Sequence, residues 1–285
     1  MSRASSEIID LSSIVDIDYS RVESYLVDFI RDVVSKAKVR GVVVGLSGGV
    51  DSSTSLMLAV KALSSSRVMS LIMPDSTVTP ENDVRDAKEL ASMAGVKFHI
   101  IDIAPIVDVY KSTIPVYTSE EGEDRIPVGN LRARIRMSLL YYYANKHNLL
   151  VLGTGDRSEI LIGYFTKYGD GAVDMLPLAI LYKTQVRMLA RHLGVPDRIA
   201  LKPSSPRLWK GHEAEKELGL TYETIDIVLH AVFDRGIKPD DVPKATGVPK
   251  SVVDKIMEMH ENSVHKREPP YSPSLNFIRD LMLSR

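Results

Sequence analysis

VVVGLSGGVDSS, residues 42–53, is an apolar run followed by a turn of glycine and serine. A continuous apolar run of this length is typical of a parallel strand covered on both faces. Beyond the turn, apolar residues recur at helical spacing at Leu56, Ala59, Val60 and Leu63. The stretch therefore predicts a buried strand over residues 42–46, then a tight turn, then a helix.

Three more apolar segments have the length and composition of buried strands. They cover residues 68–73, 97–103 and 149–153, and helical patterns separate them. Strands that alternate with helices are typical of an α/β fold built on a doubly wound parallel sheet. We expect at least four parallel strands with helices on both faces.

Helix signals flank these strands. Ser20 and Glu23 form a capping box for a helix over residues 20–37, which Gly41 terminates. Thr79-Pro80-Glu81 opens another helix with a hydroxyl cap and a proline in the first turn.

The second half of the chain combines irregular and helical segments. Residues 115–129 are polar and acidic, which predicts a surface loop, and residues 130–145 form a helix with two apolar stripes. Such a helix is either buried within one subunit, which the pattern alone favours, or shared with a partner subunit. Long irregular stretches in a compact domain are usually binding loops. These stretches cover residues 163–174 and 202–219, and helical patterns cover 184–194, 222–235 and 251–265.

Composition limits the classes of function. With 36 basic and 37 acidic residues, the net charge is −1, so no global attraction to a nucleic acid is expected. Cysteine is absent, which excludes disulfides, thiolate metal sites and a cysteine-dependent glutaminase on these 285 residues. Neither a membrane span nor a secretory signal is recognisable, so we expect a cytoplasmic protein without a membrane partner.

The glycine turn has the features of an anion site. Gly48 and Gly49 permit positive φ and close approach of a ligand, and the next helix directs its free N–H groups into the same space. Serine hydroxyls add donors, whereas Asp51 would repel a phosphate unless Mg²⁺ lay between them. The spacing matches neither a Walker loop nor a dinucleotide fingerprint. A plain tight turn with a helix cap is the alternative interpretation.

The motif Ser-Gly-Gly-x-Asp-Ser resembles the pyrophosphate loop of the N-type ATP pyrophosphatases, which adenylate an acceptor. Four later blocks resemble, in order, motifs of ammonia-dependent NAD synthetases: residues 129–137, 153–159, 163–171 and 265–267. The resemblance implies a Rossmann-like, adenine nucleotide alpha hydrolase-like fold, with a single domain over 1–285. Its core would span about 20–200, followed by a substrate loop and C-terminal helices over about 201–285.

The resemblance also implies ATP-dependent amidation of deamido-NAD by ammonia, giving NAD, AMP and pyrophosphate. Asp51, Lys183 and Asp174 would be catalytic, and Asp51 and Glu159 would bind Mg²⁺. Deamido-NAD would contact Arg134, Lys167, Asp174, His265 and Lys266. ATP would contact Gly45, Leu46, Ser47, Gly48, Gly49, Val50, Asp51, Ser52, Thr154, Lys183 and Ser205. Taken singly, each charged residue also fits a solvated helix face or a loop.

The reaction is consistent with these residues. The nicotinate carboxylate is already anionic and needs no strong base to attack the α-phosphorus, so alignment and neutralisation of the leaving pyrophosphate by Lys183 and Mg²⁺ suffice. We expect Asp174 to attract or deprotonate ammonium. The second phosphate loop departs from the family pattern at Ser204, Pro206, His212 and Ala214, whereas Ser205 and Glu215 are retained.

Two other functions remain open: a tRNA-modifying ATP pyrophosphatase and an inactive nucleotide-binding regulator. The lack of cysteine disfavours the first, and the presence of Asp51, Glu159 and Lys183 disfavours the second. The chain has no room for a glutaminase domain, so free ammonia is the expected nitrogen donor unless a separate glutaminase subunit delivers it. The resemblance further implies a homodimer, for which the helix over residues 130–145 is the interface candidate.

Overall fold

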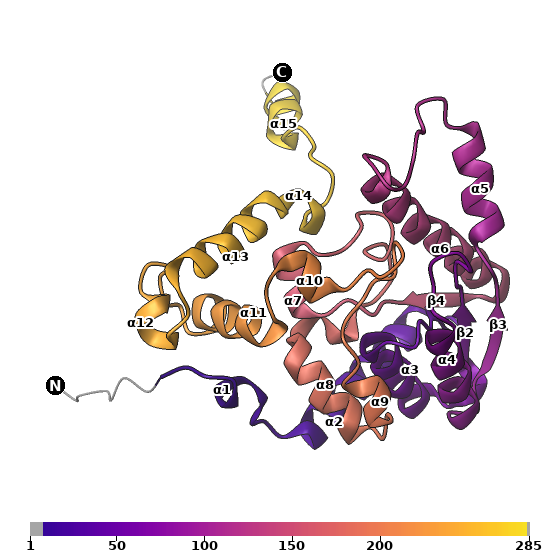
Figure 1. Cartoon of the computed structure of the whole chain (residues 1–285), viewed down its shortest axis with the longest axis horizontal. Coiled ribbons are helices and arrows are strands. Elements are labelled where there is room, and N and C mark those ends of the chain that lie inside the picture. Colours follow the sequence, from indigo (N-terminus) through magenta and orange to yellow (C-terminus); the bar gives the residue numbers. More distant parts are fainter. Residues whose placement is uncertain (1–7, 284–285) are drawn as a thin grey trace.

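The computed structural model describes residues 8–283, and its centre is a four-stranded parallel sheet (Figure 1). The strand order is β3-β2-β1-β4, and every neighbouring pair is parallel. The expected doubly wound parallel sheet is thereby confirmed. The strands are β1 (Gly41–Gly45), β2 (Val68–Ile72), β3 (Lys97–Ile100) and β4 (Leu149–Leu152).

Helices cover both faces of the sheet because successive strand side chains point to opposite sides. Val42 and Val44 of β1 pack in one apolar cluster with helices α2, α3, α4 and α8. Val43 faces the other way and packs in a cluster that includes residues of α5 and α6. The helices are α2 (Tyr19–Ala37), α3 (Val50–Leu63), α4 (Glu81–Met93), α5 (Ala104–Thr113), α6 (Arg125–His147) and α8 (Lys183–His192).

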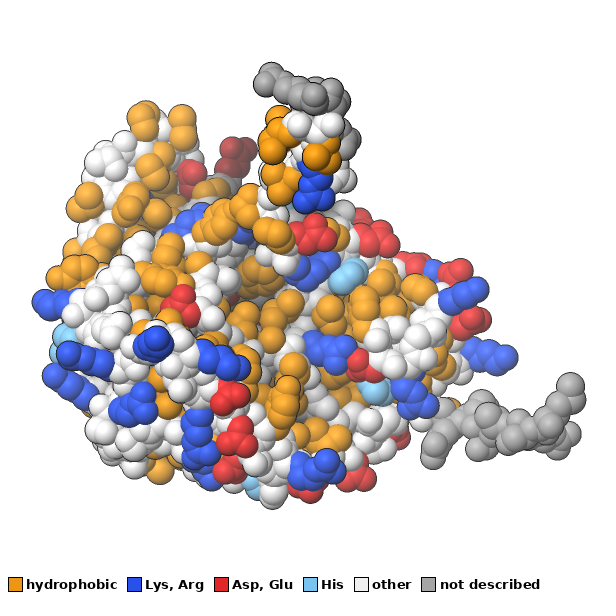
Figure 2. Space-filling model, turned by 180° about the vertical axis from the view of Figure 1, so that it is seen from behind, with side chains coloured by type: hydrophobic (Ala, Val, Ile, Leu, Met, Phe, Trp, Pro, Cys, Tyr) orange, Lys and Arg blue, Asp and Glu red, His pale blue; other side chains and the backbone are white. Residues whose placement is uncertain are grey.

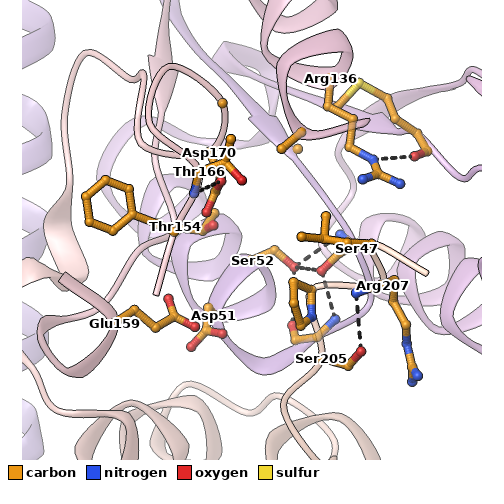
Figure 3. A pocket seen from close by; sticks show the side chains of 18 of the residues that line it. Ser47, Asp51, Ser52, Arg136, Thr154, Glu159, Thr166, Asp170, Ser205 and Arg207 are labelled. Atoms are coloured by element: carbon orange, nitrogen blue, oxygen red, sulfur yellow. Dashed lines mark hydrogen bonds between the residues drawn. The ribbon is translucent and has the colours of Figure 1, made fainter. Parts of the chain in front are cut away.

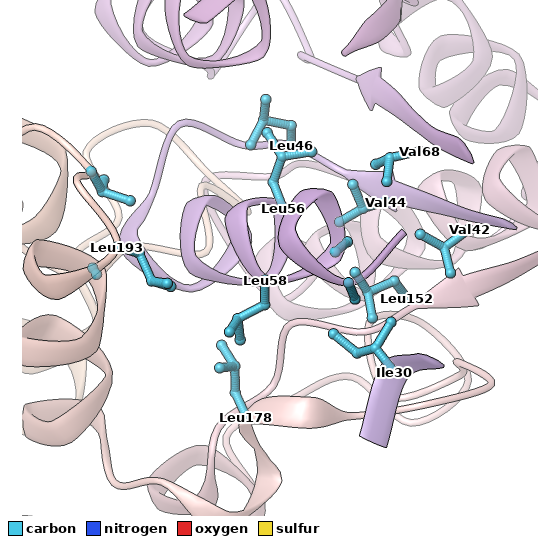
Figure 4. Packing of buried hydrophobic residues seen from close by; sticks show 14 of the residues in the cluster. Ile30, Val42, Val44, Leu46, Leu56, Leu58, Val68, Leu152, Leu178 and Leu193 are labelled. Carbon is cyan, nitrogen blue, oxygen red and sulfur yellow. The ribbon is translucent and has the colours of Figure 1, made fainter. Parts of the chain in front are cut away.

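The first of these clusters forms the main core (Figure 4). Leu56 and Leu58 of α3 lie between the strands and the outer helices, and both are fully buried. Burying a leucine side chain contributes about 1.5–3 kcal/mol, so this layer fixes α3 and the turn before it against the sheet.

The C-terminal part is helical and builds an apolar cluster of its own with α7 and the first residues of the described chain. In Figure 1 its last helix, α15, projects away from the rest. The remaining elements are α1 (Ser12–Val15), η1 (Ser65–Arg67), α7 (Arg157–Ile162), η2 (Pro177–Ile180), α9 (Asp197–Ala200), α10 (Ala214–Leu218), α11 (Tyr222–Leu229), η3 (His230–Asp234), α12 (Val242–Thr246), α13 (Lys250–Asn262), α14 (Val264–Arg267) and α15 (Leu275–Leu283). Between residues 8 and 283, none of the helices combines the length and the apolar character needed to cross a membrane.

Several expected boundaries are wrong. The acidic loop ends at Asp124 and α6 begins at Arg125, because Pro127 is tolerated in a first helical turn and Val128 is buried. Residues 202–219 are not wholly irregular, since Ala214 and Leu218 bury one face of the short helix α10. The α-helix expected over 222–235 ends at Leu229, and a π-helical turn follows it over His230–Asp234.

Both predicted hydroxyl caps are also wrong. Asp18, not Ser20, caps α2, and its side chain accepts hydrogen bonds from the N–H groups of Ser20 and Arg21. Helix α4 follows Pro80 without a side-chain cap, because the Thr79 hydroxyl instead accepts the N–H of Asp75 at 3.1 Å. At α2 two side chains could accept the same N–H groups, and at α4 the N–H of a nearby turn takes the acceptor that would cap the helix; sequence spacing decides neither competition.

The strand order places a topological switch point between β1 and β4. The chain runs from β1 outward to β2 and β3 on one side, and β4 adds to the other side of β1. In open α/β sheets, ligands bind in the crevice outside the carboxyl ends of the strands at such a point. The glycine turn follows β1 and the segment Gly153-Thr154 follows β4, so both lie at this crevice.

Candidate active site

A cavity of about 420 Å³ opens at the carboxyl ends of the strands. Its lining comes from the glycine turn, the end of β2, helix α6, the segments after β4 and the loop over residues 202–209 (Figure 3). Gly45, Leu46, Ser47, Gly49, Val50, Asp51, Ser52, Thr154, Glu159, Ser205 and Lys266 all line it. Eleven of the residues predicted from the sequence to contact ATP, metal or dinucleotide therefore share one cavity.

The glycine turn is held in the shape that an anion site needs. Gly48 has a φ of 78°, and a Cβ there would lie 2.3 Å from the carbonyl oxygen of Asp83, so no other residue fits without a shift. The hydroxyls of Ser47 and Ser52 lie 3.0 Å apart, and that of Ser52 accepts the N–H of Ser47 at 3.2 Å. The turn leads into α3, whose positive N-terminal end faces this cavity.

Three carboxylates of the site contact the buried ammonium of Lys183. Its Nζ lies 2.7 Å from Asp51 Oδ2, 2.7 Å from Asp156 Oδ2 and 2.9 Å from Glu159 Oε1. The side chains of Lys183 and Asp156 are 0% exposed, whereas Asp51 and Glu159 are about one fifth exposed. Asp51 and Glu159 line the cavity, whereas the ammonium that they contact is buried.

Charge within this cluster is unbalanced, since one ammonium faces three carboxylates. Burial alone would lower the pKa of Lys183, but Asp156, Asp51 and Glu159 hold that pKa well above its usual value. Burial raises the pKa of Glu159 and of Asp156, and the neighbouring carboxylates add to the rise.

The cluster has the properties of a divalent cation site. Its three carboxylates can each direct an oxygen to within 4.8 Å of the others, and Oδ1 of Asp51 is buried with no hydrogen-bond partner in the described chain. Three carboxyl groups around one ammonium, together with the orphaned oxygen, suit a hard divalent cation with oxygen ligands.

Asp156 was missed by the sequence analysis. It lies four residues after the end of β4 and three residues before Glu159, and its Oδ1 caps α7 by accepting the N–H of Glu159 at 2.9 Å. Its place after a strand that neighbours β1 was the available signal, because the carboxyl ends of adjacent parallel strands converge.

The loop over residues 202–213 lies across the glycine turn. Lys202 donates to the carbonyl of Gly48 at 2.9 Å, and Arg207 donates to Asp83 at 2.7 Å. Ser205 bonds the carbonyl of His212 within the same loop. The loop thus brings two cations and a hydroxyl to the cavity.

The unusual residues of this loop have structural partners. His212 is 2% exposed, stacks on Trp209 with ring centroids 3.5 Å apart, and its Nε2 lies 2.7 Å from Glu217. Ala214 is the buried first residue of α10. His212 therefore ties the loop to α10.

Four of the residues predicted to bind the dinucleotide belong to segments joined by hydrogen bonds, and one of the four, Lys266, lines the cavity. Arg134 donates to the carbonyl of Lys167, and Lys167 donates to that of His265 at 2.7 Å. Lys266 lines the cavity and donates to the carbonyls of Gly163 and Phe165.

Comparisons with known proteins identify the family. The NAD synthase family matches residues 22–270, most of the chain. The chain belongs to the NAD synthase family.

Individual relatives agree with this assignment. The NH(3)-dependent NAD(+) synthetase of Aeropyrum pernix is 56% identical over 95% of this chain and 94% of its own length. That of Staphylothermus marinus is 53% identical over 96% of this chain and 98% of its own length. Among solved structures, the NMN synthetase of Francisella tularensis has a TM-score of 0.79 at 34% identity, over 91% of this chain and 100% of that chain.

Asp174 is one of six predicted site residues outside the cavity lining of this NAD synthase family member; the others are Gly48, Arg134, Lys167, Lys183 and His265. Its carboxylate accepts the N–H of Val151 at 2.7 Å and the hydroxyl of Tyr141 at 3.2 Å, and its side chain is exposed. Its proposed contact with ammonium or dinucleotide stays a prediction.

Asp170 and Arg136 are among the charged lining residues that were not singled out from the sequence. Asp170 lines the cavity and accepts the N–H of Thr166 at 2.9 Å. Arg136 also lines it and donates to the carbonyl of Met73 at 2.9 Å, and burial lowers the pKa of Arg136 to about 10, which leaves it charged at neutral pH. Both fall inside sequence blocks that resemble family motifs, so the blocks were the signal and only the fold told which members face the cavity.

Proposed function

We propose that this chain amidates deamido-NAD with free ammonia and consumes ATP, giving NAD, AMP and pyrophosphate. The observation that carries the proposal is a cavity lined by the glycine turn, Asp51 and Glu159, whose two carboxylates pair with the buried Lys183, in a chain from the NAD synthase family. The names of relatives more than 50% identical support ammonia as the nitrogen donor.

The first step is adenylation of the nicotinate carboxylate. The glycine turn and the N-terminus of α3 hold the phosphates, and the cations of the 202–213 loop neutralise part of their charge. The carboxylate attacks the α-phosphorus and pyrophosphate leaves. Lys183 stabilises the charge that develops on the leaving group.

Mg²⁺ fits the cluster, because the orphaned oxygen of Asp51 and the grouping of three carboxyl groups both suit a hard cation. Asp51 and Glu159, joined by Asp156, would hold it. When bound, Mg²⁺ supplies Lewis-acid neutralisation of the phosphate oxygens.

The second step replaces AMP with ammonia, and ammonium must first lose a proton. Asp174 is the acceptor suggested by the sequence, but its exposed carboxylate is occupied by Val151 and Tyr141. Asp170 faces the cavity and is the better placed carboxylate. The variants Asp170→Asn and Asp174→Asn distinguish them, since loss of the acceptor slows amide formation and leaves adenylation intact.

A homodimer is part of the proposal. Apolar side chains stay exposed on α5, the loop after it and α6: Val109 is 62%, Val116 81% and Ile126 57% exposed. Figure 2 shows such side chains gathered on the upper projection that carries α5 and on α15. Exposed apolar surface of this kind is typical of subunit interfaces. Sedimentation at micromolar concentration tests the dimer, and a monomer would contradict it.

A second acceptor has a specific observation in its favour, because one similar structure is that of an NMN synthetase. The residues joined through Lys167 and His265 would contact the part of a dinucleotide that a mononucleotide lacks. A tRNA-modifying or inactive protein is not favoured by the comparisons. The cytoplasmic location and the absence of nucleic-acid and membrane partners stay predictions.

The decisive experiment incubates the protein with ATP, Mg²⁺, ammonium and either deamido-NAD or nicotinate mononucleotide, and follows NAD or NMN, AMP and pyrophosphate together. Equal amounts of NAD, AMP and pyrophosphate, with ammonium but not with glutamine, would support the proposal. Preference for the mononucleotide would support the second acceptor. Absence of ATP cleavage with both would refute the enzymatic proposal.

A further inference from the structure

Helix α11 brings two fully buried polar side chains to the segment that carries Lys183. Tyr222 and Asp226 are four residues apart, so they share one face of the helix, and both are 0% exposed. Helix α11 belongs to the C-terminal part, whereas Lys183 begins α8 beside the sheet (Figure 1).

Asp226 fixes the beginning of α8. Its Oδ2 accepts the N–H of Thr184 at 2.9 Å and the hydroxyl of Thr184 at 2.8 Å. Its Oδ1 accepts the hydroxyl of Ser158 at 2.5 Å, and that hydroxyl accepts the N–H of Lys183 at 2.9 Å. The first N–H groups of a helix lack partners inside it, so this carboxylate and hydroxyl anchor the start of α8 and join it to α7.

The same network spans both helices of the charged cluster. Ser158 is the neighbour of Glu159 on α7, and Lys183 is the first residue of α8. Any shift of α8 along its axis would move the Lys183 backbone away from Glu159 and Asp51. Asp226 resists that shift because it bonds to both helices.

Tyr222 supports the other end of the lysine side chain. The ammonium lies 5.1 Å from the centroid of its ring, within the range of a cation–π contact. Glu215 in turn accepts the N–H of Tyr222 at 2.8 Å and holds the start of α11. Helix α11 therefore supports Lys183 at its ammonium through Tyr222, and at its backbone indirectly, because Asp226 bonds to Ser158 and Thr184.

The chemistry of the contact requires a carboxylate. Three donors point at Asp226, and an ionised carboxylate only accepts hydrogen bonds. An asparagine of the same shape would direct an NH₂ group at one of those donors. A buried acid beside a cluster that is already too negative costs free energy, so simple packing does not account for it.

We propose that Asp226 is a positioning residue for adenylation. By anchoring the start of α8, Asp226 places the ammonium of Lys183 where it contacts both the carboxylates and the departing pyrophosphate. The inference rests on the proposed function for the identity of the step, but the position of Lys183 and its effect on ATP binding do not depend on the acceptor.

The test is a double-mutant cycle on the full chain with Asp226→Asn and Lys183→Gln. Asp226→Asn alone is expected to lower kcat for AMP formation about 10- to 100-fold, because small displacements of a catalytic group have effects of this size, with KM for deamido-NAD within about twofold. In the Lys183→Gln background, Asp226→Asn is expected to lower kcat for AMP formation less than about twofold, because Asp226 acts through the Lys183 side chain that this background lacks. Asp124→Asn is the matched control: that carboxylate also accepts three hydrogen bonds, at Thr118 and Ser119, on an exposed loop outside the cavity lining.

Two additions keep the outcome decisive. Ser158→Ala removes the hydroxyl between Asp226 and the Lys183 amide, and replaces Asp226→Asn if that variant fails to fold. Where the residual turnover of a variant is too low to measure, the affinity of that variant for ATP, measured by calorimetry, replaces kcat in the double-mutant cycle. An equal loss in both backgrounds, or a lowered melting temperature with unchanged kcat, overturns the inference. Wild-type protein that forms no AMP from deamido-NAD refutes the proposed function instead, and the ATP affinities then decide the inference alone.

Discussion

Replacing Lys183 with methionine should destabilise the fold in a way that depends on pH and on Mg²⁺. The substitution keeps the length and apolar stem of the side chain and removes the ammonium that lies 2.7 to 2.9 Å from three carboxylates. Two unit charges 4.8 Å apart, the upper limit for these oxygens, repel by about 3 kcal/mol at an effective dielectric constant of about 20. Removing one partner of a buried ion pair costs about 3–5 kcal/mol, and we expect a loss of that size near pH 8.

The sign of the pH dependence follows from the proton that the variant must retain. Without the ammonium, at least one carboxyl of the cluster keeps its proton when folded and is ionised when unfolded. The folded state then binds more protons, so stability falls as pH rises, by up to 1.36 kcal/mol per pH unit. The loss should be about 3 kcal/mol larger near pH 8 than near pH 5.5.

Guanidinium unfolding followed by circular dichroism, at both pH values and with and without Mg²⁺, measures these differences. Mg²⁺ at about 10 mM should restore part of the stability near pH 8, because it replaces the missing positive charge and binds the folded state. Lys61→Met is the control: Lys61 pairs with Glu23 at 2.7 Å but is 42% exposed, so its loss should be at most about 1 kcal/mol and independent of Mg²⁺. An equal loss at both pH values that Mg²⁺ does not relieve would refute this account of the cluster.

Three further predictions concern single residues. Burial raises the pKa of Asp226 to about 7, so the free energy of unfolding of the wild type should fall by about 2 kcal/mol between about pH 5.5 and 8. Asp226→Asn should not show this fall, and an equal change in the free energy of unfolding of both proteins would contradict the prediction. Tyr222→Phe should raise the free energy of unfolding by about 1 kcal/mol, because the buried hydroxyl has no hydrogen-bond partner in the described chain, and a clear loss in denaturant melts would show that it has one. Gly48→Ala should cost about 1–3 kcal/mol and weaken ATP binding, because the turn needs a positive φ and the new Cβ meets the Asp83 carbonyl; calorimetry with ATP checks it, and wild-type affinity would show that the turn tolerates a side chain.

Local patterns predicted the fold class because burial leaves a direct trace in sequence. The apolar run before the glycine turn has to be a strand covered on both faces, and the later runs repeat that pattern. Boundaries failed where neighbours compete for the same groups. Asp18 outcompeted Ser20 for the first N–H groups of α2, and Thr79 bonded Asp75 instead of capping α4.

The candidate site was predictable only in part. Asp51, Glu159 and Lys183 were predicted as site residues from the family resemblance, and the structure brings their side chains together. Asp156, Asp170 and Arg136 stand inside or beside the same blocks, but no spacing told which side chains face the cavity. Asp226 lies outside those blocks and gave no signal at all.

The sequence by itself determined the strand, the glycine turn and the helix after it, because those depend on neighbours along the chain. It also determined membership of the family, through motifs in a fixed order. Only the tertiary structure decided that Lys183 meets Asp51 across 132 residues and that α11 anchors it. The reason is physical: a buried charge takes the partners that the fold brings within about 3 Å, and that distance is set by how helices pack, not by spacing in the sequence.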